Sequence, residues 1–114
     1  MTAIGEIALF TSDVEGTAAF YCDLIGAPPI AEWPGGALFA LRSGKLLVHE
    51  RAATMDDGPP NEDHFAISVD AFDEACAKLV AHGSALLLEP RDYAWGRSAY
   101  LRDPDGRLVE LSES

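Results

Sequence analysis

The segment His-Phe-Ala-Ile-Ser-Val at residues 64–69 decides how the rest of the chain is interpreted. Phe65, Ile67 and Val69 alternate with small or polar residues, and this period of two predicts a half-buried β-strand. His64 begins the strand on the face opposite the apolar one. An imidazole in that position either binds a metal ion or is simply solvated at a strand end, and the remaining sequence bears on which of the two applies.

A similar order of elements precedes this strand. Residues 4–10 alternate in the same manner, so we predict a first strand there. Apolar residues at helical spacing follow from Val14 to Ile25, and Gly26 suits the left-handed conformation that ends many helices. Three further strands are predicted at residues 30–33, 37–41 and 46–50. The first unit is therefore expected to have the order βαβββ.

The same order is predicted again from residue 64 onwards. A helical pattern of apolar residues runs from Phe72 to Val80 and is followed by Gly83. An Asp-Pro-Asp-Gly turn at residues 103–106 separates the last two strands. The strands of this second unit that follow its helix are predicted at residues 85–88, 97–101 and 108–111.

We therefore predict one α+β domain over residues 1–114, built from two tandem βαβββ units at 1–50 and 64–114. The units are expected to form an open, half-barrel mixed sheet with the helices on its outer face. Residues 51–63 are rich in charged and turn-forming residues, which indicates an exposed linker. An open sheet leaves edges that proteins usually cover, so we also expect a homodimer.

The composition excludes several classes of partner. The chain has 114 residues, of which 19 are acidic and 8 are basic, and its formal net charge is −11. Such a surface repels nucleic acids and anionic membranes. No apolar run approaches 18 residues and no signal-peptide pattern is visible, so we expect a cytoplasmic protein. Cys22 and Cys76 lack metal-binding spacing and are interpreted as reduced residues of the helices.

Four ionisable side chains are expected on the sheet face opposite the helices. If the apolar residues of each strand face the helices, the first and last strands of the two units point four other side chains away from them. These residues are Glu6, His49, His64 and Glu110. Two imidazoles and two carboxylates can bind a divalent metal ion such as Zn, Ni, Co, Fe or Mn, among which the sequence does not select. Each residue alone is more simply interpreted as a solvated strand-end residue, but the joint arrangement favours a metal site.

In these features the chain resembles the vicinal oxygen chelate superfamily, which includes glyoxalase I, bleomycin-resistance proteins, extradiol dioxygenases and fosfomycin-resistance thiol transferases. The strand at 64–69 and the segment at 96–111, Gly-Arg-Ser-Ala-Tyr-Leu-Arg-Asp-Pro-Asp-Gly-Arg-Leu-Val-Glu-Leu, carry the resemblance. The metal positions of that family lie on the first and last strands of each unit. Glyoxalase I usually has the order His, Glu, His, Glu, whereas this chain has Glu, His, His, Glu. Glu6 also departs from the histidine usual at the first position in dioxygenases and fosfomycin transferases.

The resemblance implies two classes of function. The first is a small metal-dependent enzyme with lyase or isomerase chemistry on a substrate whose adjacent oxygens the metal chelates, with Glu6 or Glu110 as general base. The second is a bleomycin-resistance-like protein that sequesters a small-molecule ligand without a catalytic metal, and an acidic surface would suit a cationic drug. Whether the chain is an enzyme stays open at this point.

Substrate-binding residues are expected near the turns and on the strand that precedes the final one. In fosfomycin-type relatives, a serine and a tyrosine at similar spacing before the final glutamate contact the substrate. Trp33 and Trp95, aromatic residues near predicted loops, are expected either to line a cleft or to cover a dimer interface, and the sequence does not separate the two. The predicted substrate-binding residues are Trp33, Phe39, Trp95, Ser98, Tyr100 and Arg102.

Overall fold

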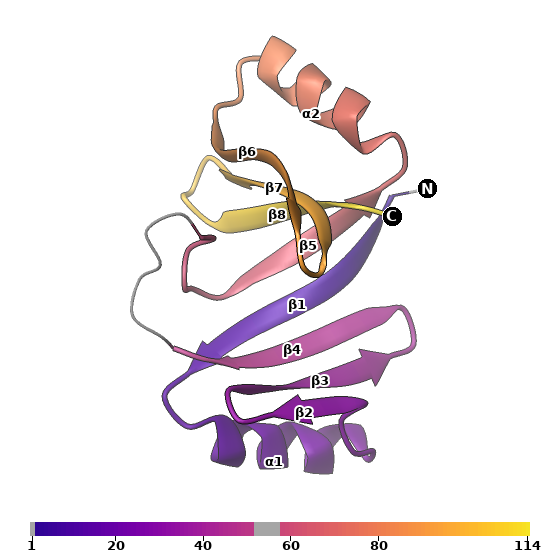
Figure 1. Ribbon diagram of the computed structural model, residues 1–114, viewed down its shortest axis with the longest axis vertical. Coiled ribbons are helices and arrows are strands. Elements are labelled where there is room, and N and C mark those ends of the chain that lie inside the picture. The colour runs from indigo at the N-terminus through magenta and orange to yellow at the C-terminus, as the bar shows by residue number, and fades with distance from the viewer. Residues whose placement is uncertain (1, 52–57) are drawn as a thin grey trace. The chain divides into compact units, whose positions relative to one another are not determined.

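The computed structural model describes residues 2–51 and 58–114 and divides them into two compact units (Figure 1). We call residues 6–63 the N-terminal unit, and residues 2–5 together with 64–114 the C-terminal unit. Residues 52–57 of the predicted linker lie outside the described residues. No helix in the described part of the chain is long and apolar enough to cross a membrane.

The elements follow one another in the order strand, helix and three strands, and this order occurs twice. The first set comprises β1 (Ala3–Thr11), α1 (Val14–Ile25), β2 (Ala31–Trp33), β3 (Gly36–Leu41) and β4 (Gly44–Glu50). The second set comprises β5 (His64–Val69), α2 (Phe72–Ala81), β6 (Leu86–Tyr93), β7 (Gly96–Arg102) and β8 (Leu108–Glu113). The predicted α+β class with a mixed sheet is confirmed, because each unit contains both parallel and antiparallel pairs.

In the N-terminal unit the strand order is β2-β3-β4-β1, with β1 and β4 parallel. Helix α1 covers one face of these strands (Figure 1). Asp13 caps its first turn by accepting a hydrogen bond from the Gly16 backbone at 2.9 Å, and Gly26 ends it with a left-handed φ of 81°. The core beneath α1 consists of Ala37, Phe39, Leu46 and Val48.

Phe39 does not line a substrate cleft, contrary to the prediction. Its side chain is 1% exposed and belongs to the core beneath α1. It pairs across β3 and β4 with Leu46, which lies in the same core, and paired residues point to the same face. The alternation of β3 therefore assigns Phe39 to packing against the helix.

In the C-terminal unit the strand order is β5-β8-β7-β6, with β5 and β8 parallel. Helix α2 packs over a core that includes Val69, Phe72, Cys76, Ala99 and Leu111. Because neighbouring residues of a strand point to opposite faces, the residues on either side of Ala99 and the residue before Leu111 face away from α2. That opposite face carries the polar cluster described below.

Candidate functional site

A hydrogen-bonded cluster of three buried polar side chains occupies the face of the C-terminal unit that α2 leaves uncovered. His64 begins β5, Ser98 lies in β7, and Glu110 lies in β8. The His64 Nε2 atom is 3.2 Å from Glu110 Oε1, and the Ser98 hydroxyl donates a hydrogen bond of 2.7 Å to Glu110 Oε2. The sequence prediction that His64 and Glu110 share one face agrees with this geometry.

The electrostatics of the cluster favour an ionised Glu110. Burial raises the pKa of this carboxyl group, but hydrogen bonds from His64 and Ser98, the charge of His64 and a hydrogen bond from Tyr100 together outweigh that effect. The net result is a pKa lowered from its ordinary value. Glu110 is only 5% exposed, so the site presents a buried carboxylate whose two oxygens are held by hydrogen bonds from neighbouring strands.

The pair formed by His64 and Glu110 has donor types that bind divalent metal ions, and its spacing is compatible with two ligands of one ion. Imidazole nitrogen and carboxylate oxygen bind such ions at about 2.0–2.2 Å, which places two ligands of one tetrahedral ion about 3.4 Å apart. The observed 3.2 Å is close to that separation. The same geometry is a charge-assisted hydrogen bond when no ion is present. The structure shows the two side chains in direct contact, and both are of types that bind divalent ions.

The four predicted metal ligands are divided between the two units, Glu6 and His49 in the N-terminal unit and His64 and Glu110 in the C-terminal unit. Among residues 2–51 and 58–114, no set of three His, Cys, Asp or Glu side chains lies close enough to hold an ion. In the N-terminal unit Glu6 pairs with Lys45, whereas His49 pairs with Phe10, four positions further along the parallel strands. At about 3.3 Å per residue, Glu6 and His49 are offset by about 13 Å along the strand direction. The strand register thus separates Glu6 from His49 along the sheet, and their role as metal ligands stays a prediction.

His49 has other contacts in the N-terminal unit. Its Nδ1 donates a hydrogen bond to the Glu50 carbonyl at 2.8 Å, and its ring lies 5.3 Å from that of Phe10. Its neighbour Val48 belongs to the core beneath α1, so His49 does point away from the helix as the alternation predicts.

A row of aromatic rings extends from His64 to the turn between β6 and β7. The ring of Tyr100 meets His64 edge-on at 5.8 Å and Tyr93 edge-on at 6.1 Å. Tyr93 in turn stacks on Trp95, with centroids 4.5 Å apart and planes within 5°. The predicted residues Tyr100 and Trp95 thus belong to one row, and Tyr93, which the sequence analysis did not single out, connects them.

The other two predicted substrate-binding residues, Arg102 and Trp33, contact other parts of the structure. Arg102 donates a hydrogen bond of 3.0 Å to the carbonyl of Gly106, in the turn between β7 and β8. Trp33 lies against Gly36 and lines a cavity in the N-terminal unit.

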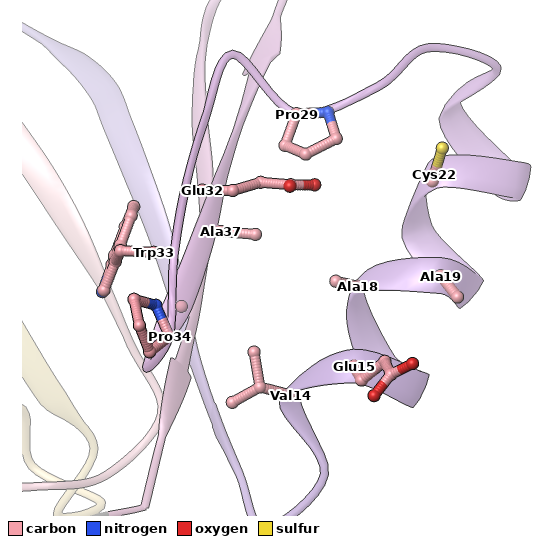
Figure 2. A pocket seen from close by; sticks show the side chains of 11 residues that line it. Val14, Glu15, Ala18, Ala19, Cys22, Pro29, Glu32, Trp33, Pro34 and Ala37 are labelled. Atoms are coloured by element: carbon pink, nitrogen blue, oxygen red, sulfur yellow. The ribbon is translucent and has the colours of Figure 1, made fainter.

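That cavity has a volume of about 380 Å³ and lies between α1 and the strands β2 and β3 (Figure 2). Val14, Ala18 and Cys22 line it from the helix, and Glu32 and Trp33 line it from the sheet side. It is on the helix-covered face of the N-terminal unit, whereas His49 points to the opposite face. The cavity is therefore distinct from the predicted metal-binding face.

The comparisons with known proteins all indicate the same protein family. Residues 3–111 match the family model described as the Glyoxalase/Bleomycin resistance protein/Dioxygenase superfamily. The metallothiol transferase FosB of Lysinibacillus sphaericus (strain C3-41) is 31% identical, over 96% of this chain and 80% of that protein. The uncharacterized protein YaeR of Escherichia coli (strain K12) is 27% identical, over 96% of this chain and 95% of that protein.

Solved structures share the fold at low sequence identity. A methylmalonyl-CoA epimerase from Streptomyces coelicolor has a TM-score of 0.77 at 23% identity, covering 100% of this chain and 95% of that one. A glyoxalase/bleomycin resistance protein/dioxygenase superfamily member from Vibrio splendidus 12B01 has a TM-score of 0.70 at 16% identity, covering 100% of both chains. These likenesses agree with the arrangement of elements described above.

Proposed function

Because the chain belongs to the glyoxalase/bleomycin resistance protein/dioxygenase superfamily, we propose that it is a metal-dependent enzyme of the glyoxalase type. Its chemistry would be that of a lyase or isomerase, on a small substrate with adjacent oxygens. The observation that carries this proposal is the buried pair of His64 and Glu110, 3.2 Å apart. A relative with 31% identity is named as a metallothiol transferase, which supports a metal in this scaffold.

His64 and Glu110 would hold the ion. A bound divalent ion supplies Lewis-acid stabilisation of negative charge that develops on a substrate oxygen. Ser98 has a supporting task, because its hydroxyl bonds Glu110 Oε2 and leaves Oε1 directed towards His64. Such outer hydrogen bonds orient metal ligands and raise their affinity, often by 10- to 100-fold. Buried as it is, the pair excludes bulk water from the carboxylate and the imidazole.

The test is metal binding by the purified, untagged protein. We expect one equivalent of a divalent ion by elemental analysis, and a measurable affinity for Mn²⁺ or Zn²⁺ by calorimetry. His64→Ala and Glu110→Ala should each lower that affinity by at least tenfold, since each removes a direct ligand. His82→Ala and Glu113→Ala are matched controls, because both side chains are exposed, and they should bind like the wild type.

The same titration addresses the two remaining predicted ligands. Glu6→Ala and His49→Ala are compared separately, because the strand register does not bring these residues together. A loss of affinity in one of them identifies a further ligand. A wild type without stoichiometric metal, or unchanged affinity in both His64→Ala and Glu110→Ala, would refute the metal-dependent function.

The second candidate is a bleomycin-resistance-like protein that sequesters a ligand without a catalytic metal. The observation that favours it is the stack of Tyr93 and Trp95, in which Trp95 is 62% exposed and free to accept a flat ligand. The net charge of −11 would attract a cationic one. Bleomycin added to the metal-free protein should then quench tryptophan fluorescence in the wild type and less in Trp95→Ala. No change in the wild type would count against this function.

We also propose that the protein is a homodimer in the cytoplasm. Phe20, Leu24 and Ile30 are 59%, 68% and 59% exposed, which is apolar surface that a second copy could cover. Cys22 and Cys76 are free thiols, as is usual in a reducing compartment. Light scattering should give twice the monomer mass of 12.2 kDa. A monomeric mass at micromolar concentration would contradict the dimer.

A further inference from the structure

The hydroxyl group of Tyr93 is shielded from solvent and has no hydrogen-bond partner. Among the side chains of residues 2–51 and 58–114, it is the only buried polar atom in this condition. A buried hydroxyl without a partner costs free energy, so proteins normally pair such groups or reserve them for a bound molecule. The buried hydroxyl of Tyr93 should therefore have a function that offsets this free-energy cost.

The ring of Tyr93 is held in place by its neighbours. Trp95 stacks on it with centroids 4.5 Å apart, the Arg91 guanidinium lies 5.4 Å from its centroid, and Tyr100 meets it edge-on at 6.1 Å. Stacking and cation–π contacts of this kind each stabilise the ring by about 0.5–1.5 kcal/mol. The hydroxyl therefore stays in its buried position instead of turning out to solvent.

Tyr93 lies on the same face as the polar cluster of the C-terminal unit. The register of β6 and β7 pairs Arg91 with Ser98, and paired residues point to the same side of a sheet. Tyr93 follows two residues after Arg91 and shares its face. Through Tyr100, which contacts His64 and donates a hydrogen bond to Glu110, the ring of Tyr93 is continuous with the proposed metal ligands.

The residue across from Tyr93 on the neighbouring strand has no side chain. Tyr93 pairs with Gly96, and a Cβ added to Gly96 would meet no atom within 4 Å. The hydroxyl is a buried donor without a protein partner, on a face that also presents a buried carboxylate and an imidazole. This is the arrangement of a polar group that fixes the orientation of a small ligand.

We propose that Tyr93 is a ligand-binding residue, whose hydroxyl donates a hydrogen bond to a carboxylate, carbonyl or oxyanion oxygen of the bound small molecule. The inference rests on the proposed function in one respect, because the ligand is the substrate with adjacent oxygens. The Tyr93 hydroxyl would select among substrates with adjacent oxygens, because it favours those that carry an acceptor oxygen where the hydroxyl can reach it. A ligand without an acceptor at that position would leave the hydroxyl unpaired and bind less tightly.

Two measurements on Tyr93→Phe test the inference. The first is urea unfolding without any ligand, with Tyr100→Phe as the matched control. Loss of an unpaired hydroxyl should leave the unfolding midpoint of Tyr93→Phe equal to or above that of the wild type. Tyr100→Phe should have a lower midpoint, because its hydroxyl bonds Glu110. A lower midpoint in Tyr93→Phe would show a structural hydrogen bond and overturn the inference.

The second measurement is the affinity for oxalate, a small anion with adjacent oxygens, with and without one equivalent of Mn²⁺. Tyr93→Phe should bind oxalate about tenfold more weakly than the wild type, since it lacks one hydrogen bond to a charged oxygen, while its Mn²⁺ affinity stays unchanged. Equal oxalate affinity in the two proteins overturns the role of Tyr93 and leaves the metal function standing. Failure of the wild type to bind oxalate under either condition also overturns it.

A different experimental result would show that the proposed metal-dependent function is wrong. A wild type that binds no Mn²⁺ refutes the metal-dependent enzyme, whatever Tyr93 does. If that protein still binds oxalate and Tyr93→Phe binds it more weakly, the ligand-binding role of Tyr93 is supported without a metal.

Discussion

The hydrogen bond between Ser98 and Glu110 should contribute measurably to stability. Ser98 is 1% exposed and its hydroxyl is 2.7 Å from a carboxylate oxygen of Glu110, which is itself only 5% exposed. Ser98→Ala leaves that oxygen buried without its donor. Hydrogen bonds to charged groups are worth about 1.5–3 kcal/mol, so we expect a loss of about 2 kcal/mol in the free energy of unfolding. That is a large share of the 5–15 kcal/mol typical of a small domain.

Urea unfolding followed by circular dichroism measures this loss. With a slope of about 1–3 kcal/mol per molar urea, a loss of 2 kcal/mol lowers the midpoint by about 1 M. Ser112→Ala is the matched control, because its hydroxyl contact with the Ile67 carbonyl is 3.5 Å long and should be worth little. A double-mutant cycle with Glu110→Gln isolates the interaction. If Ser98→Ala unfolds at the same urea concentration as Ser112→Ala, the assignment of a strong buried hydrogen bond is wrong.

Two further predictions concern the ionisation of Glu110 and the packing of Gly36. The folded-state pKa of Glu110 is lowered from the ordinary 4.5, so its ionised form contributes stability that is present above pH 4.5 and is lost as the pH falls through the folded value. The free-energy difference between wild type and Glu110→Gln should therefore be constant near neutral pH and move against the wild type below pH 4.5. A difference that does not vary with pH would contradict the lowered pKa. Gly36→Ala should cost about 1–3 kcal/mol, because its Cβ would lie 2.6 Å from the Trp33 ring and 2.7 Å from the Val48 carbonyl oxygen. Gly35→Ala, whose Cβ meets only the flexible side chain of Glu50, should cost less in the same unfolding assay, and equal costs would refute the steric explanation.

The alternation of apolar residues was sufficient to predict the strands that carry the polar cluster. Residues 64–69 were predicted as a strand with His64 opposite the apolar face, and β5 has those bounds. Glu110 was likewise predicted to face away from the helix. These predictions succeed because a half-buried strand must place every second residue in the core, so its sequence records which face is covered.

Strand β6 shows where local patterns fail. It was predicted to end at residue 88 but continues to Tyr93. Pro90 and register shifts between Leu86 and Arg91 interrupt the alternation, as is tolerated in a strand at the end of the order β5-β8-β7-β6. Tyr93 was missed for that reason, although its unpaired hydroxyl is the most distinctive polar group near the cluster.

The sequence by itself thus determined which faces of the strands are polar, and hence that His64 and Glu110 share a face. Only the tertiary structure decided how far apart residues on one face lie. Register depends on the pairing of whole strands, which no single strand encodes, and it separates Glu6 from His49 by four positions while bringing His64 within 3.2 Å of Glu110.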